Sequence, residues 1–198
     1  MEKKKGLSLQ TILTIAGLAL IYLLAFLLDR IPGVPIMLTT VLRKGAIYSL
    51  VAVSMNLLNG FTGLFSLGQA GFMLVGAYTF AVLNISSGIR STVYQYYDPL
   101  LKFSLTETLQ NVLGNTAGTV LGVFVSLLLA GFLAAVLAYL IGLPVLKLKS
   151  DYLAIATLGF AEILRAIFQW QALGKVTNGA NILKGYPTFA DFNITNAS

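Results

Sequence analysis

Glycines and neutral hydrogen-bonding side chains are concentrated between Asn56 and Gly76, in the segment NLLNGFTGLFSLGQAGFMLVG. This segment lies inside a run of 45 residues, 45–89, that has no charged side chain. Glycine lets another backbone approach closely, and a broken backbone at membrane depth is tolerated where it is buried in protein or lines a wet cavity. We therefore predict a glycine-broken transmembrane segment near residues 59–71 that lines a translocation path. The alternative is close packing of small residues between helices. The predicted lining residues are Asn56, Asn59, Gly60, Gly63, Ser66, Gly68, Gln69 and Gly71.

A second polar group lies within residues 150–171, which read SDYLAIATLGFAEILRAIFQWQ. On a helix, Asp151, Glu162 and Arg165 fall on one face. If the helix begins near Ser150, a rise of 1.5 Å per residue places Glu162 about 18 Å into it, near mid-bilayer. Ionisable residues at that depth face the bundle interior or a pathway. Two interpretations stay open for Glu162 and Arg165: a part of the path, or an intramembrane ion pair that only holds helices together.

Enzymatic chemistry has little support in this sequence. The chain has no Cys and no His, which removes thiolate sites and the commonest metal ligand and general base. The aspartates fall in predicted loops or at helix ends, and no G-x-x-x-x-G-K-[ST] motif occurs. We expect no catalytic, metal-binding or cofactor-binding residues, and we expect any ATP to be bound by separate subunits.

The elements that must position these residues are membrane helices. The chain is 57% apolar and 10% charged, whereas a soluble domain carries about 25% charged residues. We predict an all-α integral membrane protein, a polytopic helical bundle in contact with membrane lipid. The net charge of +6 is modest and no Lys/Arg cluster alternates with aromatic residues, so nucleic-acid binding is not expected.

The apolar runs predict about five transmembrane helices, at 6–28, 45–60, 66–83, 110–146 and 150–171. We expect residues 84–108 to form an external loop with tyrosines at the membrane interface, and residues 172–198 to form an external tail. In the fourth run, small residues at helical spacing, such as Gly118, Gly122 and Gly131, predict tight helix packing. Three N-terminal lysines place that end in the cytoplasm, although Arg43 and Lys44 oppose this topology.

Two stretches resemble a known family. Residues 56–78, NLLNGFTGLFSLGQAGFMLVGAY, are similar to the signature of branched-chain amino acid ABC transporter permeases of the LivM/LivH type. Residues 147–169, KLKSDYLAIATLGFAEILRAIFQ, and the following TNGAN resemble the LivM side of that family. Gln69 stands where the family usually has His, which keeps hydrogen bonding but removes titration.

The resemblance implies a permease subunit of an ABC importer that forms the path for Leu, Ile or Val-like amino acids. It implies a second, LivH-like permease subunit, two ATP-binding subunits and an extracytoplasmic solute-binding protein, in a bacterial or archaeal plasma membrane. It also implies a longer fold, so residues 1–198 are expected to be a single transmembrane permease domain that forms the N-terminal part of it. The alternatives are a related permease for urea or another small polar solute, and a structural membrane subunit without transport.

Overall fold

The computed structural model describes residue 17 and residues 36–188, and every regular element among them is helical. The predicted all-α fold is therefore confirmed. The predicted first crossing at 6–28, apart from residue 17, and the end of the predicted tail, from 189, lie outside the described residues. The elements are α2 Ile36–Thr62, α3 Gln69–Asn84, α4 Ser87–Val93, α5 Leu105–Leu113, α6 Asn115–Val145, α7 Ser150–Gln169, the 3-10 turn η1 Gln171–Leu173 and α8 Gly174–Thr177.

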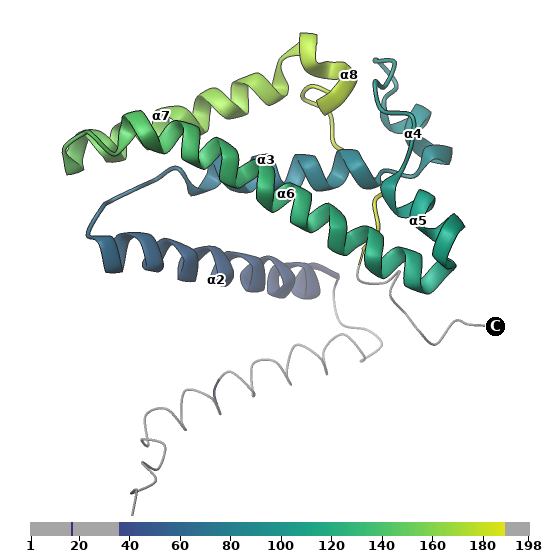
Figure 1. Cartoon of the computed structure of the whole chain (residues 1–198), viewed down its shortest axis with the longest axis horizontal. Coiled ribbons are helices and arrows are strands. Elements are labelled where there is room, and N and C mark those ends of the chain that lie inside the picture. The colour runs from purple at the N-terminus through teal and green to yellow at the C-terminus, as the bar shows by residue number, and fades with distance from the viewer. Residues whose placement is uncertain (1–16, 18–35, 189–198) are drawn as a thin grey trace, which may run out of the picture. The chain divides into compact units, whose positions relative to one another are not determined.

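The chain divides into two compact units, residues 1–57 and 58–198. Most of α2 belongs to the first unit, and its last turn belongs to the second. In the second unit α3 packs against α6, α7 and α5, and α5 also packs against α6. The short helices α4, α5 and α8 gather at one end of α3, α6 and α7 (Figure 1).

The predicted glycine break is present between α2 and α3. Helix α2 ends at Thr62, and residues 63–68 are not helical before α3 begins at Gln69. Gly63 has φ = +68°, in the left-handed region that side chains other than glycine rarely adopt. The break therefore starts at a residue suited to leaving the helix.

Among the described residues, two helices are long and apolar enough to cross a membrane: residues 40–62 of α2 and residues 115–145 of α6. Helix α7 with η1 and α8, bent by 58°, makes a third if the pair is one span. Helix α3 has 16 residues, about 24 Å at 1.5 Å each, which is shorter than a bilayer core of about 30 Å. The chain is thus membrane-embedded, with two or three candidate spans among the described residues.

The predicted crossing at 110–146 is not one continuous helix. Gly114 has φ = +86° and separates α5 from α6. Helix α5 folds back against the start of α6, where Cβ atoms added at Gly118 and Gly122 would lie 2.3 Å from Gln110 Cα and 2.8 Å from Thr106 Cα. These two glycines fulfil the predicted packing role, whereas Gly131 has nothing within 4 Å of an added Cβ atom.

Residues 84–108 fold into α4 and the first turn of α5, and they enclose a small core of Ile85, Val93 and Tyr94. Tyr94, one of the tyrosines predicted to lie at the membrane interface, is buried and donates its hydroxyl to Val176 O at 2.7 Å. The segment after α7 packs here too, since Asn178 Nδ2 donates to Val93 O at 2.9 Å. The loop and tail predicted to be external therefore share one end of the bundle.

Candidate functional site

The backbone N–H groups between α2 and α3 donate hydrogen bonds to side-chain oxygens. The Ser66 N–H donates to Asn59 Oδ1 at 3.3 Å, and the Gly68 N–H donates to Ser66 Oγ at 3.4 Å. Between them, the Leu67 N–H donates to Thr157 Oγ1 of α7 at 3.0 Å. An unsatisfied N–H in a membrane costs several kcal/mol. Side-chain oxygens thus replace the helical carbonyls that these consecutive N–H groups lack.

The break also packs tightly against α7. A Cβ atom added at Gly68 would lie 3.3 Å from Thr157 Cβ, and one added at Gly71 would lie 3.0 Å from Ala161 Cα. The cavity left between Gly68, Phe72 and α7 measures only about 10 Å³, room for about one water molecule. The structure therefore shows this end of α3 closed against α7.

The remaining predicted path residues are distributed over both units. Asn56 belongs to the first unit, and Gly60 lies within the last turns of α2 in the second. Gln69 is the first residue of α3 and is half-buried. The structure thus joins Asn59, Ser66, Gly68 and Gly71 in one contact region. That the eight predicted path residues contact solute stays a prediction.

Glu162 and Arg165 are paired, with Arg165 Nη1 lying 3.5 Å from Glu162 Oε2. Their side chains are 65% and 59% exposed, so they face outward from the second unit and not into its interior. The buried face of α7 is formed instead by Leu153, Thr157 and Ala161, at steps of one helical turn. The predicted depth in the membrane and the choice between path and helix contact stay predictions.

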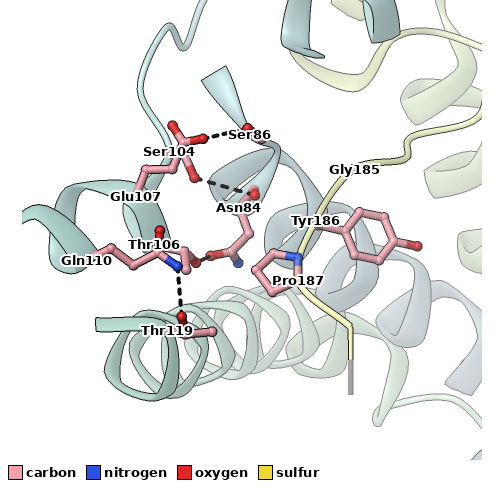
Figure 2. Close-up of a pocket in the computed structure, with 10 residues that line it drawn as sticks. All are labelled: Asn84, Ser86, Ser104, Thr106, Glu107, Gln110, Thr119, Gly185, Tyr186 and Pro187. Atoms are coloured by element: carbon pink, nitrogen blue, oxygen red, sulfur yellow. Dashed lines mark hydrogen bonds between the residues drawn. The ribbon is translucent and has the colours of Figure 1, made fainter. Parts of the chain in front are cut away.

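A larger polar cavity, of about 340 Å³, lies at the other end of α3. Its lining comes from the end of α3, from α5, from α6 and from the segment 185–187, which passes on the side opposite Glu107 and Gln110 (Figure 2). The lining residues are Asn84, Ser86, Ser104, Thr106, Glu107, Gln110, Thr119, Gly185, Tyr186 and Pro187.

Asn84 is the centre of a buried hydrogen-bond network beside this cavity. Its Oδ1 accepts hydrogen bonds from Thr106 Oγ1 and, at 3.0 Å, from Ser126 Oγ, while its Nδ2 donates to Phe80 O at 2.8 Å. A fully satisfied buried network rigidifies the elements that it joins. The network therefore ties α3, α5 and α6 together.

Arg90 and Glu107 are charged side chains at this end, outside the candidate spans. The buried Arg90 donates through Nη2 to Ile85 O at 2.8 Å and to Phe103 O at 2.9 Å, and its burial lowers the pKa of the guanidinium. Burial alone would raise the pKa of Glu107, but hydrogen bonds from Ser86 and Ser87 outweigh it, and the pKa falls below its usual value. Glu107 is therefore ionised at neutral pH, where a guanidinium is protonated in any case.

Thr157, Asn84, Arg90 and Glu107 were not among the site residues predicted from the sequence. Thr157 had one signal, because it is a hydroxyl residue between apolar neighbours on the same stretch as Glu162. Arg90 had another, because it is the charge that ends the long uncharged run. Neither signal identifies a partner, since Leu67 and Thr157 are 90 residues apart.

Known proteins similar to this chain share one description. The profile of the family "Branched-chain amino acid transport system / permease component" matches residues 37–198. The high-affinity branched-chain amino acid transport system permease protein LivM of Salmonella typhimurium strain LT2 is 35% identical over 141 residues, and that of Escherichia coli strain K12 is 32% identical over 141 residues. Each match covers 71% of this chain and 25% of the relative, so the matched region spans about a quarter of the length of these relatives. No solved structure matches the chain significantly.

Proposed function

This chain belongs to the family of permease components of branched-chain amino acid transport systems, and from that premise we propose that it forms part of the membrane path of an ABC importer. The proposed solutes are Leu, Ile and Val-like amino acids. The observation that carries the proposal is the glycine break between Thr62 and Gln69, whose backbone is satisfied by neutral side chains at the end of a candidate span.

The chemistry of the break suits an amino acid. A zwitterion needs its charged ends met by dipoles, while an aliphatic side chain needs only apolar contact. The N-terminus of α3 at Gln69 carries the positive end of a helix dipole, which favours a carboxylate. Neutral groups such as Asn59, Ser66 and Gln69 bind weakly, as a path requires when recognition takes place elsewhere.

The proposed assembly contains further subunits. They are a second, LivH-like permease subunit, two ATP-binding subunits and an extracytoplasmic solute-binding protein, in the plasma membrane of a bacterium or archaeon. The sequence has no phosphate-binding G-x-x-x-x-G-K-[ST] loop, which supports the assignment of ATP to separate subunits. The chain itself acts as a multi-pass conduit with no cofactor and no catalytic residue.

Uptake measurements test this proposal. Cells of the source organism with and without the gene for this chain are compared for uptake of radiolabelled leucine, with isoleucine, valine or urea as competitor. We expect uptake to depend on the gene and on ATP, and to be reduced by isoleucine and valine only. Competition by urea would favour a permease for a small polar solute, and unchanged uptake without the gene would contradict a transport role.

A further inference from the structure

We propose that Thr157 is the positioning residue that holds the glycine break closed against α7, and that the path opens by breaking its hydrogen bond to Leu67. This inference rests on the proposed function and adds to it the contact that must change during transport. The first observation is the hydrogen bond from the Leu67 N–H to Thr157 Oγ1, at 3.0 Å, which links the break directly to α7.

Burial makes this hydrogen bond a strong constraint. Thr157 is 9% exposed, and its own hydroxyl proton is donated within α7 to Ala154 O at 3.0 Å. The hydroxyl oxygen is thereby oriented toward Leu67. The neighbouring N–H groups of Ser66 and Gly68 have acceptors within 58–68, namely Asn59 and Ser66. Leu67 thus makes the hydrogen bond of this stretch that reaches a different helix.

The fit around Thr157 shows why the contact closes a path. Gly68 lies so near that its added Cβ atom would be 3.3 Å from Thr157 Cβ and 3.5 Å from Thr157 O. The cavity that remains measures about 10 Å³, far less than an amino acid occupies. A solute that passes between the break and α7 therefore requires Leu67 and Gly68 to leave Thr157.

The first experiment measures exposure of the break. The chain has no natural cysteine, so Leu67→Cys provides one label site and keeps the backbone N–H. Thr157→Val removes the acceptor and retains the branched shape, whereas Thr157→Ser retains the hydroxyl. We expect Thr157→Val to raise the maleimide labelling rate about two- to twelve-fold, the shift that one net hydrogen bond supplies, and Thr157→Ser to restore the slow rate.

Thr79→Val is the matched control. Thr79 lies on α3 and its hydroxyl donates only within that helix, to Val75 O at 2.8 Å. We expect it to leave labelling at position 67 unchanged. The proposal would be overturned if Leu67→Cys were labelled at the same rate with Thr157→Val as with Thr157 unchanged. It would also be overturned if Thr79→Val raised the rate by the same factor. These rates do not require transport, so they test the contact even if the proposed function fails.

The second experiment separates a contact that must open from one that is only structural. The distance of 3.3 Å between the Cβ positions of Gly68 and Thr157 is close to the 3.5–4.5 Å typical of disulfides. We expect the double variant Gly68→Cys/Thr157→Cys to oxidise, to lose uptake, and to regain on reduction the uptake of the less active single variant. Full uptake by the oxidised double variant would overturn the proposal, because the contact would then not need to open.

Discussion

Replacing Gly118 with alanine should weaken the packing of α5 against α6. The added Cβ atom would lie 2.3 Å from Gln110 Cα and 2.4 Å from Gln110 N, so α5 must move by about 1 Å to restore ordinary contact. Such overpacking costs about 1–3 kcal/mol, and the shift also disturbs the hydrogen bond from Gln110 Nε2 to Thr119 Oγ1, worth about 1 kcal/mol. The higher helix propensity of alanine stabilises the folded state by about 1 kcal/mol relative to glycine. The net loss in the free energy of unfolding is about 1–3 kcal/mol.

Gly131→Ala is the control, because Gly131 lies on the same helix with nothing within 4 Å of an added Cβ atom. It should gain about 1 kcal/mol from propensity alone. The two variants should differ by about 2–4 kcal/mol, which corresponds to roughly 4–16 °C in the melting temperature of a chain of this size. Thermal unfolding in detergent, followed by circular dichroism, measures this difference. Equal melting temperatures for the two variants would refute the described contact between α5 and α6.

Two further predictions concern charged side chains. The pKa of Glu107 is lowered in the folded state, so its contribution to stability is complete above the usual value of about 4.3 and is lost as the pH falls through the lower folded value. The deficit in melting temperature of Glu107→Gln should therefore be constant near neutrality and shrink below about pH 4.3. A deficit independent of pH would contradict the assigned hydrogen bonds. Glu162→Ala and Glu162→Ala/Arg165→Ala should differ by less than about 1 kcal/mol in stability in detergent, because the paired side chains are 65% and 59% exposed. A single variant that is several kcal/mol less stable than the double variant would contradict this outward position.

The sequence was sufficient for the features that depend on local chemistry. The helical class follows from long apolar runs, and the position of the break follows from glycines that leave a helix, of which Gly63 at φ = +68° is the direct case. The pairing of Glu162 with Arg165 follows from their spacing of three residues on a helix. The family resemblance drawn from residues 56–78 and 147–169 agrees with the match over residues 37–198.

Features that depend on contacts between distant residues could not be predicted. Asn59 and Ser66 were predicted as path residues from their polarity, but their oxygens also satisfy the backbone of the break. Glu162 faces outward because another face of α7, with Thr157 and Ala161, packs against Gly68 and Gly71. The periodicity of the sequence does not show which face of α7 makes this contact. The fold of residues 84–108 depends on Arg90 binding carbonyls on both sides of it, at Ile85 and Phe103, and composition predicts only a solvated loop there.

If the glycine break forms part of a solute path, a side chain at Gly63 that the break cannot accommodate should abolish leucine uptake, and Gly63→Leu provides this change. Gly63 has open space around an added Cβ atom but requires φ = +68°, whereas Gly76 of α3 has open space in an ordinary helical position, so Gly76→Leu is the control. The yield of the complex, recovered through a tagged ATP-binding subunit, is measured in parallel. We expect Gly63→Leu to lose uptake at normal yield and Gly76→Leu to retain both. Full uptake by Gly63→Leu, or an equal loss of yield in both variants, would contradict this expectation.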